Sequence, residues 1–157
     1  MKIKILEAQS NEATTLSVFI KSVYDVSVAP YYSERGNNEF YTYIDSSAIK
    51  NRLETNHWIL IAENDNQLVG IIEIRDDKHV SMLFVQLDHQ RKGIGRQLLE
   101  AAIKKAKESN PNLKRMTVHS SPNSLAAYER LGFKPVSQEK MVNGIRFTTM
   151  EKAIAVE

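Results

Sequence analysis

The chain lacks cysteine altogether, so none of its 157 residues can form a disulfide, act as a thiol nucleophile or bind zinc through sulfur. Long apolar runs are also missing. No stretch approaches the ~20 apolar residues of a membrane-spanning helix. The N-terminal segment MKIKILEAQSNE alternates charged and apolar residues and contains no signal-type apolar run. We therefore expect a cytoplasmic protein with no membrane contact.

The sequence carries little net charge, +2, but the charge is unevenly distributed. Residues 88–115 hold 8 Lys and Arg against 3 Asp and Glu, a local excess of +5. Such clustering suits a polyanion, either a nucleic acid or a phosphorylated small molecule, although three of the lysines can equally form the solvated face of a helix. The segment has no Phe, Trp or Tyr on which bases could stack, so we expect no nucleic-acid partner.

Hydrophobic residues make up 42% of the chain and charged residues 25%, values typical of a globular protein, and the length suits a single domain over residues 1–157. Periodicity and turn residues predict the order β-α-α-β-β-β-α-β-α-β-β, a mixed α/β sheet. The expected strands are 2–7, 58–63, 68–75, 79–87, 115–120, 133–139 and 145–151. The expected helices begin at Ser10 or Asn11, at Ser46 or Ser47, at Gly93 and at Ser121, and residues 26–45 are expected to form loop and broken helix.

The most informative segment is QRKGIGR, residues 90–96, between an expected strand and an expected helix. Amides at a helix N-terminus have no partner within the helix and lie at the positive end of its dipole. Gly93 and Gly95 have no Cβ, so a diphosphate can approach the backbone closely. The segment matches neither the P-loop pattern nor the three-glycine dinucleotide pattern. A plain strand-to-helix turn is the alternative interpretation.

Two motifs together resemble the GNAT superfamily of acyl-CoA-dependent N-acyltransferases. Gln90-Arg91-Lys92-Gly93-Ile94-Gly95 is similar to the family's Gln/Arg-x-x-Gly-x-Gly/Ala motif. Downstream, residues 121–133 resemble the family's later helix, which ends Tyr-x-x-Leu-Gly-Phe. The motifs stand in family order with one strand between them, and the element order extends the resemblance over nearly the whole chain. It says nothing of the acceptor.

The resemblance implies roles for particular residues. The diphosphate of acetyl-CoA would lie on the loop formed by Arg91, Lys92, Gly93, Ile94, Gly95 and Arg96. Its pantetheine arm would pair with the strand at Leu83, Phe84 and Val85, and that strand should splay away from the strand holding Val118. Many relatives have an asparagine where this chain has Ser121. We expect Ser121 to cap the helix and Asn123 to reach the coenzyme.

The resemblance also implies catalytic groups, and no metal. Tyr128 falls on the family's frequent general acid, although it could simply be a core residue at helical spacing. The base is not fixed by the motifs; Glu73 is our candidate and His79 is the other. We treat His57, His89 and His119 as structural or solvent-facing.

The acceptor would be the primary amine of a small molecule or a peptide, attacked without an acyl-enzyme intermediate. Aromatic and charged residues between the first helices are the expected acceptor wall, where a cationic amine would find both rings and carboxylates: Tyr31, Tyr32, Glu34, Arg35, Gly36, Phe40 and Tyr43. The alternative is that these aromatic side chains only pack the loop against the rest of the protein. A non-catalytic CoA-binding or sensor domain is the alternative function, and a homodimer is one of the oligomeric states that the sequence leaves open.

Overall fold

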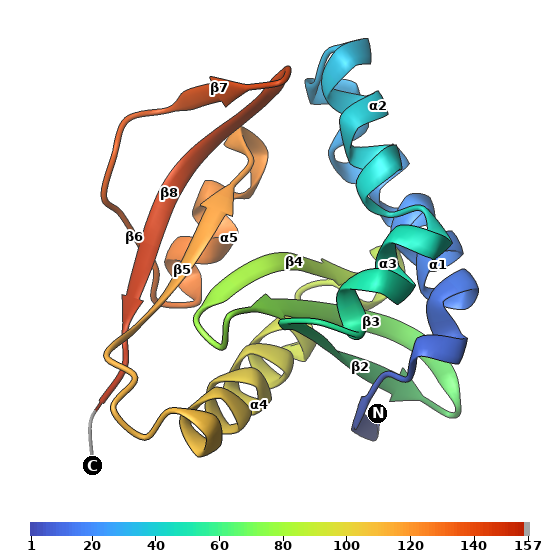
Figure 1. Ribbon diagram of the computed structural model, residues 1–157, viewed down its shortest axis with the longest axis vertical. Helices are drawn as coiled ribbons and strands as arrows, with labels where there is room; N and C mark the ends of the chain where they lie inside the picture. The colour runs from blue at the N-terminus through green and yellow to red at the C-terminus, as the bar shows by residue number, and fades with distance from the viewer. Residues whose placement is uncertain (156–157) are drawn as a thin grey trace.

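The computed structural model describes residues 1–155, shown in Figure 1. The strands are β1 (Ile3–Glu7), β2 (His57–Asn64), β3 (Gln67–Arg75), β4 (His79–Val85), β5 (Arg115–Ser120), β6 (Lys134–Pro135), β7 (Lys140–Val142) and β8 (Ile145–Ala153). The α-helices are α1 (Ala13–Ser27), α2 (Glu34–Tyr43), α3 (Ser46–Leu53), α4 (Ile94–Ser109) and α5 (Leu125–Arg130). Short 3-10 turns cover Ser10–Glu12, Ala29–Tyr31, Leu87–His89 and Pro122–Ser124. The mixed α/β fold predicted from the sequence is confirmed.

The sequence prediction is wrong about residues 26–45, which contain a regular helix, α2, rather than loop and broken helix. Ser33 begins this helix, because its hydroxyl accepts a hydrogen bond from the Gly36 amide at 3.1 Å. Long-range contacts hold it in place. Tyr24 of α1 stacks on Phe40 with ring centroids 3.9 Å apart, and Tyr24 donates a hydrogen bond to Asn37.

Two further local predictions are wrong. The first helix is capped by neither Ser10 nor Asn11: a 3-10 turn precedes α1, and the Gln9 amide donates to the Glu12 carboxylate at 2.8 Å. Of the expected strand 133–139 only the two residues of β6 are extended in the sheet, and β7, which pairs with β8, begins beyond it at Lys140. The predicted turn at Asn143 and Gly144 is present, and both residues have the positive φ of a tight hairpin turn.

The strands follow the order β1-β2-β3-β4-β5-β8-β6, with β7 pairing β8. All pairs are antiparallel except β4 and β5, which are parallel and pair only at His79–Thr117 and Val80–Val118. The expected divergence of these two strands is therefore confirmed. Glu73 pairs with Met82 and Ile74 with Val80, so Ser81 is the extra residue of a β-bulge where β4 leaves β5.

Helices cover both faces of the β1–β4 part of the sheet (Figure 1). One core cluster joins α1 and α3 to one face of β2, β3 and β4; the other joins α4 to the opposite face. None of the helices in residues 1–155 combines the length and the apolar character needed to cross a bilayer. The open edge of β4 beyond the bulge lies between the two halves of the molecule, which Figure 1 shows separating above the junction of β4 and β5.

Candidate active site

The loop before α4 presents unpaired backbone amides to one point. Arg91 (φ +63°) and Gly93 (φ +84°) both adopt left-handed conformations, which turn successive N–H groups in one direction. The amide of Gln97 donates to the Gly93 carbonyl at 3.0 Å, whereas residues 91–96 donate none of the backbone hydrogen bonds found within residues 1–155. A Cβ on Gly93 would meet no atom within 4 Å. The loop can therefore receive an anion such as a diphosphate.

A groove of about 770 Å³ extends from this loop along β4 to α5. It gathers nearly all the residues that the resemblance assigned to the coenzyme: Leu83, Phe84, Val85, Arg91, Gly93, Ile94, Gly95, Arg96 and Asn123. Lys92 is exposed and lies outside the groove wall. Arg96 crosses toward α5, where its guanidinium donates to the Arg130 carbonyl at 2.7 Å. The groove thus has cationic groups at its phosphate end and an open strand edge beside it.

The start of α5 is held by side chains rather than by the expected serine cap. Ser121 donates to Asn123 at 2.9 Å and lies 2.8 Å from the Ser124 hydroxyl, and it makes no cap bond to a backbone amide. The side-chain amide of Asn123 donates to the Ser27 carbonyl at the end of α1. Asn123 therefore joins α1 to α5 while its exposed side chain lines the groove.

Tyr128 of α5 lies where this groove meets a second cavity. Its ring packs edge-on against Phe133, with centroids 5.5 Å apart, so part of the side chain belongs to the core. Burial raises the pKa of Tyr128, which keeps the phenol protonated at neutral pH. No residue among 1–155 hydrogen-bonds to its hydroxyl, and the phenol proton is free for a ligand.

The second cavity, hereafter the acceptor cavity, has a volume of about 380 Å³ and lies between α1, α2 and β4 on one side and β5 and β8 on the other. Five residues line both it and the groove: Val28, Leu83, Phe84, Ser124 and Tyr128. Of the expected acceptor wall, Tyr32, Phe40 and Tyr43 line the cavity; Tyr31, Glu34, Arg35 and Gly36 do not. The two spaces are therefore joined at Tyr128, one with an anion cradle and one with an aromatic wall.

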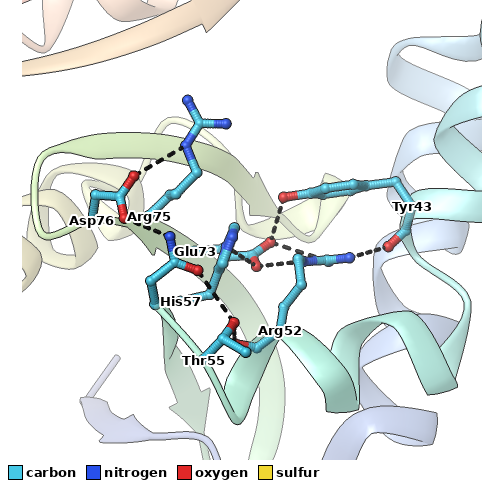
Figure 2. Close-up of polar contacts among 8 residues, drawn as sticks. Tyr43, Arg52, Thr55, His57, Glu73, Arg75 and Asp76 are labelled. Atoms are coloured by element: carbon cyan, nitrogen blue, oxygen red, sulfur yellow. Dashed lines mark hydrogen bonds and ion pairs between the residues drawn. The ribbon is translucent and has the colours of Figure 1, made fainter.

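Glu73 does not line the acceptor cavity, and it contacts Tyr43, which does. Figure 2 shows Glu73 at the centre of a group of polar side chains. Its fully buried carboxylate accepts a hydrogen bond from Arg52 Nε at 2.8 Å and one from the Tyr43 hydroxyl at 3.2 Å, and His57 Nδ1 lies 2.9 Å from it. Burial alone would raise the pKa of Glu73, but hydrogen bonds and charge from His57 and Arg52 outweigh it and lower the pKa. This geometry disfavours Glu73 as a base that touches the substrate.

Two imidazoles line the acceptor cavity on the β4–β5 side. His79 and His119 pack with ring centroids 4.6 Å apart, and His119 also stacks on Phe147 of β8. His79 Nδ1 lies 2.7 Å from the Thr117 hydroxyl. Burial and the charge of Arg75 lower the pKa of His79 to about 3 and also lower the pKa of His119. Both rings are therefore neutral near pH 7 and can accept a proton.

The family model for the acetyltransferase (GNAT) domain matches residues 28–154, which include the whole groove loop and α5. The chain belongs to the GNAT acetyltransferases. Among curated proteins, it is 29% identical to the uncharacterized N-acetyltransferase YafP of Escherichia coli over 126 residues, which cover 80% of this chain and 76% of YafP.

Solved structures share the fold of this GNAT domain. A GCN5-related N-acetyltransferase from Rhodopseudomonas palustris superposes with a TM-score of 0.84 at 23% identity, over 98% of this chain and 97% of that one. The PaiA N-acetyltransferase of Thermoplasma acidophilum, solved in complex with coenzyme A, gives a TM-score of 0.81 at 22% identity, over 98% and 100% of the chains. At this identity the likeness shows the fold alone.

Sequence reasoning missed several residues of the GNAT domain's acceptor cavity. His119, which we expected to be structural or solvent-facing, lies on the cavity wall, and Phe147 and Ser81 line it as well. Phe147 comes from β8, which returns beside β5, and Ser81 is turned by the β-bulge. Both placements depend on strand pairing that no local pattern reveals. His57, by contrast, is structural as expected, beside Glu73.

Proposed function

We propose that this GNAT acetyltransferase moves the acetyl group of acetyl-CoA directly to the primary amine of a small acceptor. The observation that carries the proposal is the junction of the two spaces at Tyr128: the groove with the anion cradle and the acceptor cavity share its side chain. A thioester delivered along the groove and an amine held in the cavity would meet there. Direct attack requires that the two substrates meet at this junction, and it does not require a residue that carries the acetyl group.

The open strand edge supports the placement of the coenzyme. Beyond the bulge at Ser81, β4 has no partner on its β5 side, so its backbone offers donors and acceptors to an extended ligand. The pantetheine arm of CoA contains two amides of that kind, and the diphosphate of CoA fits the free amides and cations of residues 91–96. These features of the groove are what make acetyl-CoA the donor in the proposal.

The proposed reaction forms one C–N bond and breaks one C–S bond. The neutral amine attacks the thioester carbonyl, the thiolate of CoA leaves, and the Tyr128 phenol donates its proton to the sulfur. A thiol of this kind has a pKa near ~8.5, by analogy with cysteine, so proton donation assists its departure. Tyr128 is buried enough to remain protonated until the thiolate forms.

The attacking nitrogen must also lose a proton. Because Glu73 does not line the cavity, we assign the proton acceptor to the neutral imidazoles of His79 and His119, which line it. Once its bond to the carbonyl carbon forms, the nitrogen is more acidic than the free ammonium ion. The imidazoles are weak bases because their pKa values are lowered, so they pass the proton on to solvent rather than keep it. Solvent at the cavity mouth returns the proton to Tyr128 and completes the cycle.

The proposal is tested by calorimetry with CoA and by thiol release from acetyl-CoA in the presence of a panel of amines. We expect CoA to bind and at least one amine to be acetylated. The Tyr128→Phe variant should keep CoA affinity and fold while kcat falls by about 10²-fold, the usual effect of a general acid. CoA binding without turnover of any amine would favour the sensor function, and absence of CoA binding would overturn both.

A further inference from the structure

Seven of the 21 residues that line the acceptor cavity are Phe or Tyr. Tyr24, Phe40 and Phe84 form one packed group, with Phe40 and Phe84 centroids 6.0 Å apart, and Phe147 lies on the β8 side. A volume of about 380 Å³ is at the small end of the range for ligand sites, roughly 300–1,000 Å³. Such a space suits a flat apolar body, which gains both area burial and ring contacts.

The cavity lining has no excess of negative charge that would bind a polycation. Among the described residues that line it, Glu39 is the one carboxylate and Arg75 the one Lys or Arg, and both are exposed. The buried carboxylate of Glu73 is already paired with Arg52. The Arg52 guanidinium also lies 3.6 Å from the centre of the Tyr43 ring, so that ring face already holds a cation. Aromatic residues here therefore do not form a free cation site.

One polar anchor is built into this wall. The ionised Glu73 carboxylate can only accept, so the single hydroxyl proton of Tyr43 is donated to it at 3.2 Å. The Tyr43 oxygen can therefore act toward a ligand only as an acceptor, and it shares that acceptor capacity with the neighbouring Ser81 hydroxyl. Burial raises the pKa of Tyr43, and the buried hydroxyl of Ser81, close by in the lining, lies near enough to the Tyr43 oxygen to oppose that rise by hydrogen bonding.

On one side of the cavity, α2 approaches the β7–β8 turn, and the two lie near each other in Figure 1. Gly36 and Gly144 pack so closely that a Cβ on Gly36 would lie 2.4 Å from the Gly144 carbonyl oxygen. Tyr32 donates to the Arg146 carbonyl at 2.7 Å across the same contact. This contact joins α2 to the β7–β8 hairpin beside the cavity, whose lining includes Asn143 and Ile145 of that hairpin.

Resting on the proposed acetyl transfer, we propose that the acceptor is a compact arylalkylamine: an aromatic ring joined by a short chain to a primary amine. The ring packs among the aromatic walls, and the amine donates to the oxygen of Tyr43, which the Glu73 carboxylate orients. Tyr43 is thus a residue that selects and positions the acceptor. The imidazoles of His79 and His119, which line the same cavity, receive the proton that the amine releases.

The test compares 2-phenylethylamine, spermidine and a short lysine peptide as acceptors with saturating acetyl-CoA. We expect kcat/KM for 2-phenylethylamine to exceed that of the other two by at least tenfold. A spermidine or peptide value equal to or above it would overturn the arylalkylamine assignment while leaving acetyl transfer intact. If CoA binds and no amine is acetylated, the proposed function fails. Calorimetry of 2-phenylethylamine with the CoA-loaded protein then tests the ligand class by itself. If 2-phenylethylamine does not bind, the arylalkylamine assignment is overturned as well.

Two matched variants test the anchor. Tyr43→Phe keeps the ring and removes the oxygen, so KM for 2-phenylethylamine should rise about tenfold, as for one lost hydrogen bond, with CoA affinity unchanged. Tyr31→Phe makes the same change at an exposed tyrosine outside the cavity and should leave both constants as they were. An unchanged KM in a folded Tyr43→Phe protein would refute the anchor, and circular dichroism establishes that it is folded.

Discussion

Replacing Glu73 with glutamine removes one charge from the centre of the buried network in Figure 2 while keeping the side chain's shape. The Arg52 guanidinium, whose side chain is only 13% exposed, would keep the Tyr43 carbonyl as acceptor but lose its ion pair. Breaking one partner of a buried pair costs about 3–5 kcal/mol. We expect the lower end of that range, about 3 kcal/mol, because Arg52 retains this carbonyl and some exposure to water.

Thermal and urea unfolding followed by circular dichroism measure this cost. In a domain of this size each kcal/mol shifts Tm by roughly 2–4 °C, so Tm should fall by roughly 6–12 °C. The variants Arg52→Met and Glu73→Gln/Arg52→Met complete a double-mutant cycle, and the double variant should be more stable than the sum of the single changes predicts. Glu139→Gln disrupts the exposed pair with Arg146 and should change stability little. Additive single effects, or a Glu73→Gln protein as stable as the wild type, would refute the reasoning.

The same network predicts how stability depends on pH. The pKa of Glu73 is lower in the folded protein than its ordinary value of 4.5, so its stabilisation is complete above that value. It is lost as the pH falls through the lowered folded pKa. Asp25 and Asp45, whose pKa values are also lowered, contribute equally to wild type and variant. The stability gap between wild type and Glu73→Gln should therefore narrow below pH 4.5, as urea midpoints measured down to pH 3 would reveal.

Three other outcomes are expected. Because the pKa of His79 is lowered to about 3, this imidazole should not limit activity near neutral pH. The acidic side of the pH profile of kcat/KM should therefore shift with the pKa of the amine used. An inflection fixed near 6.5 for two amines of different basicity would count against this. Arg96→Ala should weaken CoA binding about fivefold to tenfold in calorimetry and reduce its salt dependence, whereas Arg115→Ala, on β5 outside the groove, should do neither. Gly36→Ala should push α2 from Gly144 and raise the acceptor KM without changing CoA affinity, and equal effects on both ligands would argue against a local opening.

The phosphate loop was predictable because its signals are local. Residues 90–96 carry the glycines, cations and helix start in one continuous segment, and the structure places nearly all of them around one groove. The turn at Asn143 and Gly144 was predictable for the same reason. The helix α2 was not, because its sequence is rich in polar residues and contains Gly36. Its stability comes from Tyr24 on α1 and from close packing against Gly144, both distant in sequence.

The acceptor side was harder to predict because its residues come from strands that are not consecutive. His119 and Phe147 stack only because β8 inserts beside β5. The candidate base Glu73 illustrates the same limit: in the run Ile71-Ile72-Glu73-Ile74, alternation places its side chain on one face but does not say what covers that face. Its partner Arg52 lies 21 residues away on α3, and the sequence offers no sign of the pairing.

The buried network raises the question of why the fold carries it at all. Replacing a buried ion pair with apolar side chains of similar volume is often neutral or stabilising, so stability alone does not account for Glu73 and Arg52. Their common neighbour is Tyr43. Arg52 donates to its carbonyl and covers its ring, and Glu73 accepts a hydrogen bond from its hydroxyl. The network therefore fixes the orientation of one wall residue of the acceptor cavity, at the point where β4 leaves β5. If this is its purpose, Glu73→Gln/Arg52→Met should recover stability in the cycle yet show a raised KM for the amine, because the Arg52 guanidinium no longer holds the Tyr43 carbonyl and ring.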